Sequence, residues 1–280
     1  MTISKSETEK ENSNLSGDYC STFTLRTWLN KAPFSLALSS GFFGFFAHAG
    51  VVSALEMEGF KPQRLMGSSA GALVSALWAS GLSSTEIRSE LLQLKREDFW
   101  DPGLGLGLLK GNLFEERLKD LLRCHSFEHC VIPVQMSAFD CFRLKAQLFD
   151  QGDLVSAIRA SCTFPGLFHP RWIDGKPYID GGVTDRSGLL GAMKEERVFY
   201  HHLASRSWWR SRVGLTSLPK RNHQVSMVLK NLPRCGPHDL DQAELAFNQA
   251  QEQTLQALDQ HLLPSQYAIY TSAFNDAWLT

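Results

Sequence analysis

The feature that most constrains this chain is a Gly-x-Ser-x-Gly motif placed between a short apolar segment and an apolar helix. It lies within Arg64-Leu65-Met66-Gly67-Ser68-Ser69-Ala70-Gly71-Ala72-Leu73-Val74. In a strand–turn–helix setting this motif forms a nucleophile elbow, in which the central serine hydroxyl stands above the edge of a sheet. Gly67 and Gly71 permit the sharp turn and the close approach of a neighbouring element. The motif therefore predicts an α/β sheet with the Ser69 hydroxyl exposed at its edge.

A candidate site carboxylate lies much later in the chain, at the start of Asp180-Gly181-Gly182. The segment before it, residues 172–179, predicts a β-hairpin. An acidic residue that ends an apolar strand and precedes two glycines presents its carboxylate on a tight backbone bend. The bend therefore presents the Asp180 carboxylate, and Gly181 and Gly182 are expected to support it.

A third candidate element is the turn Ser40-Gly41-Phe42-Phe43-Gly44. It follows a strand predicted over residues 33–39 and precedes a helix predicted over 45–55, so it places unpaired backbone N–H groups where an anion can bind. No Lys-Ser/Thr pair follows and the G-x-G-x-x-G pattern is not met, so phosphate binding is the weaker interpretation. An oxyanion site formed by the backbone of Gly41, Phe42, Phe43 and Gly44 is the better one, if Ser69 lies beside it.

These elements, in this order, resemble the patatin-like phospholipase family of serine lipid acyl hydrolases, which use a Ser–Asp dyad. The resemblance covers roughly residues 33–190 and includes Ala160-Ser161-Cys162 with Pro165 and Phe168. It implies a three-layer α/β/α sandwich with a central, mainly parallel sheet. It also implies that Ser69 is the nucleophile, that Asp180 is the base and that the backbone around residues 41–44 is the oxyanion hole.

The turn before the first helix departs from the family pattern. Ser39 and Ser40 stand where glycines are usual, and Phe43 stands where a basic residue is common. The backbone donors survive these changes, whereas the missing positive charge bears on oxyanion stabilisation and on the lipid headgroups accepted. The resemblance implies cleavage of phospholipid or lysophospholipid esters through an acyl-Ser69 intermediate, which a water activated by Asp180 then releases. A catalytically silent, lipid-binding relative is the alternative.

A Ser–His–Asp hydrolase is the rival mechanism. The chain order Ser…Asp…His leaves His201, His202 or His223 as the third member. The strand predicted over residues 197–203 is expected to turn one of the first two histidines inward. His48, within the first predicted helix, is expected to pack or to cap.

Composition limits the cofactors, the partners and the location. A formal net charge of -1 argues against nucleic-acid binding. The six cysteines are scattered and match neither a zinc site nor a dense disulfide framework, so we expect neither a metal nor a nucleotide cofactor. Residues 1–30 predict a weakly ordered polar tail without a signal peptide, residues 31–280 predict one hydrolase domain, and the predicted location is cytoplasmic.

Two segments raise the question of membrane contact. Residues 32–55 and 65–85 carry no charge and are long enough to span a bilayer, although serines interrupt both and buried parallel strands have the same composition. Residues 203–237 contain no acidic residue and include Trp208, Trp209 and Arg210. Aromatic and basic side chains together suit peripheral contact with an anionic membrane, and a solvated loop whose tryptophans cover the core is the alternative. The sequence does not predict an oligomeric state.

The remaining local patterns predict ordinary elements. Residues 134–139 and 144–149 form a predicted hairpin, and Ser83-Ser84-Thr85-Glu86 is a capping box at the start of a helix. Asn112 is expected to cap the next helix and Asp153 the one after it. A closing helix within residues 239–263 is expected to turn four leucines inward, and residues 267–271 form a predicted edge strand. The four leucines are Leu240, Leu245, Leu255 and Leu258.

Overall fold

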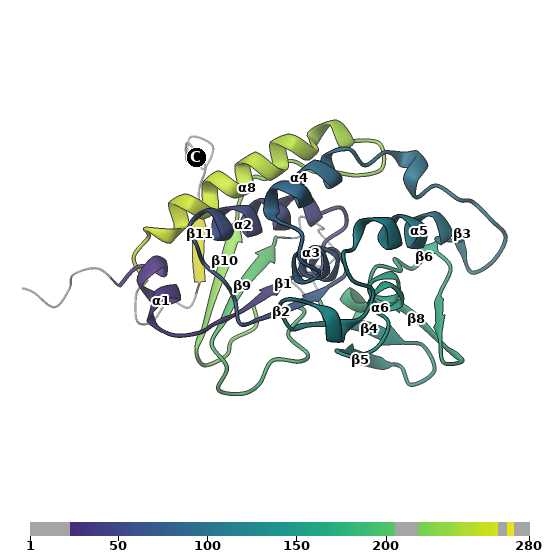
Figure 1. Ribbon diagram of the computed structural model, residues 1–280, viewed down its shortest axis with the longest axis horizontal. Helices are drawn as coiled ribbons and strands as arrows, with labels where there is room; N and C mark the ends of the chain where they lie inside the picture. Colours follow the sequence, from purple (N-terminus) through teal and green to yellow (C-terminus); the bar gives the residue numbers. More distant parts are fainter. Residues whose placement is uncertain (1–22, 205–217, 263–267, 272–280) are drawn as a thin grey trace, which may run out of the picture.

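The chain alternates strands with helices and joins nine of its strands into one sheet (Figure 1). The computed structural model describes residues 23–204, 218–262 and 268–271. The strands of the large sheet are β1 (Ser35–Leu38), β2 (Arg64–Ser68), β4 (Val134–Asp140), β5 (Lys145–Phe149), β7 (Arg171–Ile173), β8 (Lys176–Asp180), β9 (Val198–Leu203), β10 (Gln224–Leu229) and β11 (Ala268–Thr271). A second, small sheet pairs β3 (Gly107–Leu109) with β6 (Gly166–Phe168).

The described helices are α1 (Leu25–Lys31), α2 (Phe45–Met57), α3 (Ala70–Ala79), α4 (Ser84–Leu92), α5 (Asn112–Leu121), α6 (Leu154–Ser161) and α8 (Ala243–Leu258). Among them, α1 precedes β1 and the others lie between strands in the chain. Short 3₁₀ turns occur at η1 (Arg96–Asp98), η2 (Phe127–His129), η3 (Gly181–Val183) and η4 (Leu240–Gln242).

Most of the large sheet is parallel. Its strand order is β11-β10-β9-β1-β2-β4-β8-β7, and β5 pairs with β4. Every pairing from β11 to β4 is parallel, whereas β5, β7 and β8 pair antiparallel to their neighbours. The predicted α/β fold class with a mainly parallel central sheet is confirmed.

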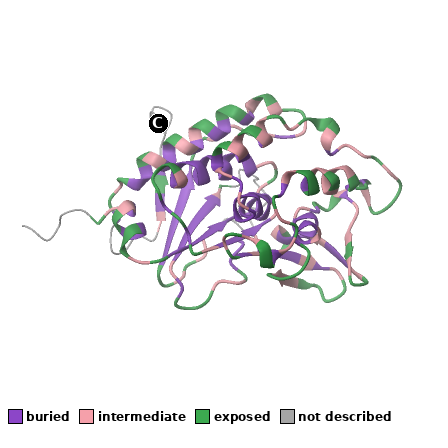
Figure 2. Cartoon of the chain, viewed as in Figure 1, coloured by how far each residue is buried: buried purple, intermediate pink, exposed green. Residues whose placement is uncertain are grey.

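The sheet is buried on both faces, which explains why its central strands are almost entirely apolar or small. Leu36 and Leu38 of β1 face the core shared with α2, α3 and α8, while Ala37 between them faces a second cluster. Within the described ranges, Leu189 from the chain between β8 and β9 covers that second face. The buried strands lie beneath the helical layer in Figure 2.

Short-range signals located most of these elements correctly. The two predicted hairpins are present as β4–β5 and β7–β8. Asp174 and Gly175 form the turn of the second hairpin with φ values of 47° and 73°, as a two-residue hairpin turn requires. The capping box at Ser83 begins α4, Asp153 caps α6, and the edge strand β11 closes the parallel part of the sheet.

Two local predictions are wrong because a distant residue or a close helix contact overrides the pattern. Asn112 does not cap α5: the helix begins at Asn112, and both carboxylate oxygens of Asp101 accept its first backbone N–H groups. Leu245 on α8 is exposed, not inward. The buried face of α8 instead carries Phe247 and Ala250, which lie against Gly50 of α2 so closely that an added Cβ on Gly50 would meet the Phe247 carbonyl oxygen at 2.4 Å.

Part of the segment predicted as a polar tail, residues 23–30, is folded instead. Thr24 caps α1 by accepting the N–H of Thr27, and Leu25 and Leu29 of this helix are buried. The Leu25 N–H donates to the carbonyl of Gln260 at 3.2 Å, which joins α1 to the end of α8. The ordered chain therefore includes residues assigned to the tail, and residues 1–22 lie outside the described residues. Among the described residues, no helix combines the length and the apolar character needed to cross a bilayer.

Candidate active site

Ser69 occupies a strained elbow between β2 and α3. Its backbone angles are φ 53° and ψ -120°, a conformation that costs energy for any residue with a side chain. Gly71 lies against the end of β1, since an added Cβ there would stand 2.0 Å from the Leu38 carbonyl oxygen. An added Cβ on Gly67 would meet the Gly71 carbonyl carbon at 2.4 Å. The predicted elbow is present, and both glycines are required by close packing.

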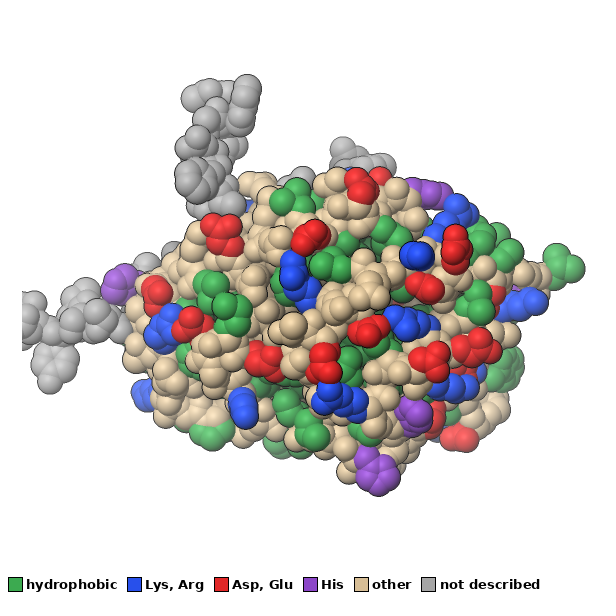
Figure 3. All heavy atoms as spheres, turned by 45° about the horizontal axis from the view of Figure 1, so that its top comes forward, with side chains coloured by type: hydrophobic (Ala, Val, Ile, Leu, Met, Phe, Trp, Pro, Cys, Tyr) green, Lys and Arg blue, Asp and Glu red, His purple; other side chains and the backbone are tan. Residues whose placement is uncertain are grey.

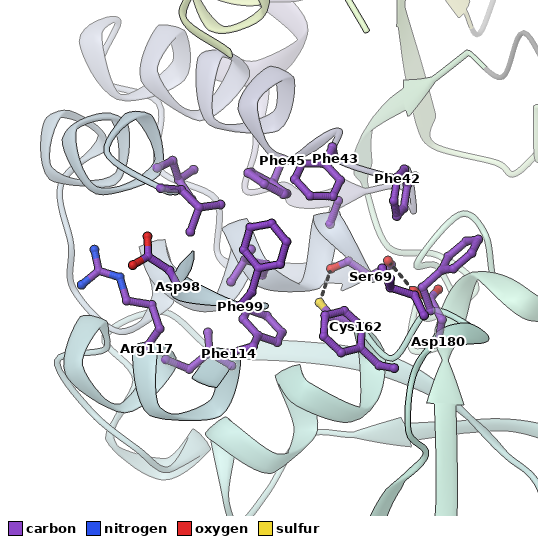
Figure 4. A pocket seen from close by; sticks show the side chains of 18 of the residues that line it. Phe42, Phe43, Phe45, Ser69, Asp98, Phe99, Phe114, Arg117, Cys162 and Asp180 are labelled. Carbon is purple, nitrogen blue, oxygen red and sulfur yellow. Dashed lines mark hydrogen bonds between the residues drawn. The ribbon is translucent and has the colours of Figure 1, made fainter. Parts of the chain in front are cut away.

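The fold brings Ser69 and Asp180 into direct contact, as Figure 4 shows. Ser69 Oγ donates to Asp180 Oδ2 at 2.6 Å, and Gly182 N–H donates to Asp180 Oδ1 at 2.8 Å. The Asp180 side chain is almost completely buried, and its backbone N–H donates to the Thr163 carbonyl at 2.8 Å. The carboxylate is therefore held from two directions with one oxygen aimed at the serine hydroxyl.

The two glycines after Asp180 make this placement possible. An added Cβ on Gly181 would lie 2.2 Å from the Ser137 carbonyl oxygen, and one on Gly182 would lie 2.2 Å from Ser40 Oγ. Gly182 therefore packs directly beside the residue that begins the glycine turn. The close packing places the Asp180 bend and the turn over residues 41–44 at the same end of the sheet.

The turn over residues 41–44 lies next to Ser69, because Gly41, Phe42 and Phe43 line the same pocket. Within the described part of the chain, no hydrogen bond uses the backbone N–H of these three residues. Gly44 differs from the expectation, since its N–H donates to the Gly41 carbonyl at 2.9 Å and closes the turn. Three of the four predicted oxyanion donors thus remain, and the fourth holds the turn together.

An apolar pocket extends from Ser69 between α3, α4, α5 and β6. It has a volume of about 920 Å³ including its open mouth. Phe99 and Phe114 lie in its middle, and Arg117 and Asp98 lie at the end away from Ser69 (Figure 4). Arg117 forms an ion pair with Glu90 at 2.7 Å, and Glu90 lines the same end. The remaining apolar lining includes Phe45, Leu73, Leu91, Leu94, Leu118, Leu121, Phe164, Leu167 and Phe168.

Among the described residues that line this pocket there is no histidine. His48 and His201 are fully buried and bond to each other, with their Nδ1 atoms 2.8 Å apart. The Ser39 carbonyl can only accept, so His48 Nε2 donates to it at 2.7 Å and both rings are neutral in this arrangement. Ser69 Oγ reaches the Asp180 carboxylate without an intervening imidazole.

The two remaining candidate histidines, His202 and His223, also have no contact with Ser69 among the interactions described. His202 Nδ1 lies 2.8 Å from the Tyr200 hydroxyl, and His202 is also buried. The expectation that only one of His201 and His202 faces inward is wrong, because both faces of β9 are covered. His223 is exposed and lies 3.4 Å from a Glu195 carboxylate oxygen.

Three residues close to Ser69 and Asp180, namely Arg159, Ser161 and Cys162, help to position the site. The sequence did not predict this role for them. Ser161 Oγ accepts the Ser69 N–H at 2.9 Å, and Cys162 Sγ lies 3.3 Å from the Ser69 carbonyl. Burial, with the nearby Asp180 carboxylate, raises the pKa of the Cys162 thiol and keeps it protonated. Arg159 is buried and donates to Thr163 Oγ1 at 2.7 Å and to the Gly111 carbonyl at 3.0 Å. All three residues lie at the end of α6, where Arg159 and Ser161 belong to its last turn and Cys162 is its C-cap.

Arg159 has an unusual electrostatic environment. Burial lowers its pKa to about 10, and its remaining Nη2 donates to the Lys110 carbonyl at 2.9 Å. It therefore joins the start of α5, which lines the pocket, to the segment that holds Asp180. Within the described ranges, no group of three or more histidine, cysteine or acidic side chains converges as metal ligands. The predicted membrane-contact residues Trp208, Trp209 and Arg210 lie outside the described residues.

Comparison with known proteins gives one family and one fold. Residues 36–193, more than half of the chain, match the family model of patatin-like phospholipase. An uncharacterized NTE family protein of Mycobacterium tuberculosis is 32% identical over 154 residues, which cover 54% of this chain and 43% of that protein. The uncharacterized protein YqhO of Bacillus subtilis is 24% identical over 225 residues, 66% of this chain and 71% of that one.

A solved structure agrees with the fold. The crystal structure of VipD from Legionella pneumophila has a TM-score of 0.58 and 14% sequence identity, and the match covers 81% of this chain and 67% of that chain. At this identity the likeness concerns the fold alone. The present chain spans less than half the length of the NTE family relatives, with 43% of their length matched.

Proposed function

The chain belongs to the patatin-like phospholipase family, and on that premise we propose that it is a serine acyl hydrolase acting on carboxyl esters of lipids. The observation that carries this proposal is the 2.6 Å hydrogen bond from Ser69 Oγ to Asp180 Oδ2 at the end of an apolar pocket. A serine hydroxyl is a poor nucleophile until a base accepts its proton during attack. Asp180 is the only acidic side chain in contact with that hydroxyl within the described residues.

In the proposed first step, Ser69 Oγ attacks the ester carbonyl carbon as its proton moves to Asp180 Oδ2. The proton then passes to the departing alkoxide, which leaves as an alcohol, and the acyl group stays on Ser69. In the second step Asp180 accepts a proton from water, whose oxygen attacks the acyl carbon. The bond between Ser69 Oγ and that carbon then breaks, the carboxylic acid is released, and the proton returns from Asp180 to Ser69 Oγ. Free N–H groups of Gly41, Phe42 and Phe43 stabilise the developing oxyanion, where one donor contributes about 3–4 kcal/mol.

The pocket supports a lipid acyl chain as the group that Ser69 accepts. Its wall is formed by phenylalanine and leucine side chains over its whole middle section. Each methylene of an acyl chain buried against such a wall contributes about 0.8 kcal/mol of binding free energy. The apolar path ends where the Glu90–Arg117 pair and Asp98 begin, and this end limits the length of chain that the pocket accepts.

We also propose that residues 31–280 act as one hydrolase domain. Strands β9 to β11 continue the sheet that carries Ser69, and α8 packs on α2, the helix that follows the oxyanion turn. The second candidate function is lipid binding without catalysis, because Phe43 stands where the family commonly has a basic residue. In that case the pocket would bind an acyl chain without turnover.

Covalent labelling with a fluorophosphonate tests the proposed function. The reagent phosphonylates an activated serine oxygen and releases fluoride, so we expect the native chain to be labelled on Ser69 and Ser69→Ala to remain unlabelled. Ser68→Ala is the matched control, because Ser68 is fully buried and is not among the residues that line the pocket. It should label like the native chain. A native chain that resists the reagent would favour the silent relative.

A second prediction concerns acyl-chain preference. Phe114→Asp places a carboxylate in the middle of the apolar pocket. Because a bound acyl chain would remove water from that charge at a high cost in free energy, we expect the ratio of p-nitrophenyl palmitate to p-nitrophenyl acetate hydrolysis to fall by about 10–100-fold. The measurement is kcat/KM for both esters.

Leu113→Asp is the control for this change, because Leu113 precedes Phe114 on α5 but does not line the pocket. It should leave the ratio within about twofold, because the half-buried Leu113 side chain lies outside the pocket lining. Equal ratios in the native chain and both variants would show that the acyl chain binds elsewhere.

A further inference from the structure

The segment that follows η1 and runs into β3 exposes leucine side chains that the proposed reaction does not use. It reads Gly103-Leu104-Gly105-Leu106-Gly107-Leu108, with a leucine at every second position and glycines between them. Leu104 is fully exposed, Leu106 is 81% exposed and Leu108 is 49% exposed. The loop projects at the end of the molecule next to β3 (Figure 1), and the space-filling view ends in a projecting hydrophobic side chain on the same side (Figure 3).

Specific contacts hold this loop in an ordered shape. The Gly103 N–H donates to the Leu108 carbonyl at 3.1 Å, and the Lys110 N–H donates to the Asp101 carbonyl at 2.9 Å. The His169 ring packs against Gly105, where an added Cβ would meet His169 Cε1 at 2.2 Å. The exposed leucines are therefore presented by a built hairpin.

The same loop is joined to the wall of the pocket. β3 pairs with β6, and the His169 N–H donates to the Leu109 carbonyl at 2.9 Å. Leu167 and Phe168 of β6 line the pocket, and buried Leu109 packs with Phe168. A surface that holds the leucine loop would therefore lie beside the acyl-binding wall.

We propose that the loop over residues 103–108, which we call the leucine loop, inserts into the surface of a lipid bilayer or micelle. This proposal rests on the proposed function, because insertion of the leucine loop would bring the acyl-binding pocket to the lipid esters that the enzyme is proposed to cleave. Monomeric proteins rarely expose neighbouring large apolar side chains without an interaction to cover them. Glycines between the leucines mean that insertion of the loop tip buries no polar side chain.

The area of the leucine loop favours lipid over a protein partner. Three leucine side chains offer on the order of 400 Å², about half of the area that each partner of a standard protein interface buries. A narrow projection is poorly suited to a broad protein surface, whereas a fluid lipid surface closes around it. This comparison excludes a second copy of the chain as the preferred occupant.

Charge around the leucine loop does not select an anionic headgroup. Residues 95–110 contain as many basic as acidic side chains, namely Lys95, Arg96 and Lys110 with Glu97, Asp98 and Asp101. The attraction is therefore apolar insertion, and docking is expected on zwitterionic phosphatidylcholine and to be insensitive to salt. Binding through the basic segment that contains Trp208 and Arg210 would instead need anionic lipid and would weaken as the salt concentration rises.

Co-sedimentation with phosphatidylcholine vesicles tests the proposal, using the full chain with Ser69→Ala so that no lipid is consumed. In that background we expect Leu104→Ser with Leu106→Ser to lower the partition coefficient by about 100-fold, since two buried leucines are lost. Met57→Ser with Leu245→Ser removes two exposed apolar side chains from α2 and α8 and is the matched control. It should change partition by less than about threefold.

A second measurement keeps the proposal testable if the double variant folds poorly. In Leu104→Trp, brominated phosphatidylcholine should quench more fluorescence than in the unsubstituted chain. Native-like partition of the loop double variant, or no added quenching in Leu104→Trp, would overturn the proposal. So would binding that needs anionic lipid and disappears in high salt, or a dimer in solution that the loop substitutions dissociate. Each of these outcomes is independent of whether Ser69 reacts with a fluorophosphonate.

Discussion

Ser69→Ala is expected to lower kcat/KM for p-nitrophenyl esters by about 10⁴-fold or more, because it removes the atom that carries the acyl group in the proposed mechanism. The substitution deletes one hydroxyl at a residue where nothing else changes in the packing of the elbow. The thermal unfolding midpoint should therefore stay within a few degrees of the native value. Hydrolysis that survives in Ser69→Ala would place the reaction at another residue.

Asp180→Asn tests the other member of the pair and should reduce kcat/KM by about 10³–10⁴-fold, since the amide cannot accept the serine proton. The amide oxygen can still accept the Gly182 N–H, so the bend at residues 180–182 is expected to remain. Asp174→Asn is the matched control on the same hairpin. Its φ of 47° suits asparagine, and it should hydrolyse esters like the native chain.

A large loss of stability is expected between pH 7 and pH 5. Burial lowers the pKa of His48 to about 4, and burial with the nearby Arg186 guanidinium lowers the pKa of His202 to about 4. The unfolded chain binds a proton at each of these rings below about pH 6.5, while the folded chain does not until about pH 4. Stability is therefore present above pH 6.5 and is lost as the pH falls toward 4.

For one such histidine the loss at pH 5 is about 2 kcal/mol, and for His48 and His202 together about 4 kcal/mol. Burial also lowers the pKa of His201 well below its ordinary value, which adds to the loss. Urea unfolding at pH 7 and pH 5 measures the difference in unfolding free energy. A difference below about 1 kcal/mol would contradict neutral, buried histidines.

Two variants test whether the buried histidines cause this pH dependence of the unfolding free energy. His202→Asn removes one buried ring and should reduce the difference between pH 7 and pH 5 by about 2 kcal/mol. His223→Asn removes an exposed ring, and its φ of 57° is one that asparagine tolerates. It should retain the whole difference, whereas an equal reduction in both variants would point to the unfolded chain instead.

The sequence predicted the parts of this molecule that depend on neighbouring residues. The strand, Ser69 and the start of α3 at Ala70 follow from a local turn motif, and the β7–β8 hairpin follows from Asp174-Gly175. Asp180 was located because its own bend needs two glycines. Its contact with Ser69 followed from the family resemblance, since no local pattern relates two positions so far apart.

Long-range contacts account for the rest. Asp101 caps α5 from a loop of its own, so the nearer Asn112 was the wrong candidate. The Ser161 hydroxyl and the Arg159 guanidinium act on residues that only folding brings near them. The charged end of the pocket combines Glu90 of α4 with Arg117 of α5, and the spacing within either helix gives no sign of the other.

The backbone of Ser69 has an evolutionary consequence. At φ 53° and ψ -120°, glycine would be the more comfortable residue, because it has no Cβ to conflict with the turn. Stability alone would therefore favour loss of this side chain in any lineage that no longer needed its hydroxyl. Glycine at the equivalent position of a descendant would mark a protein that had kept the pocket and abandoned the chemistry.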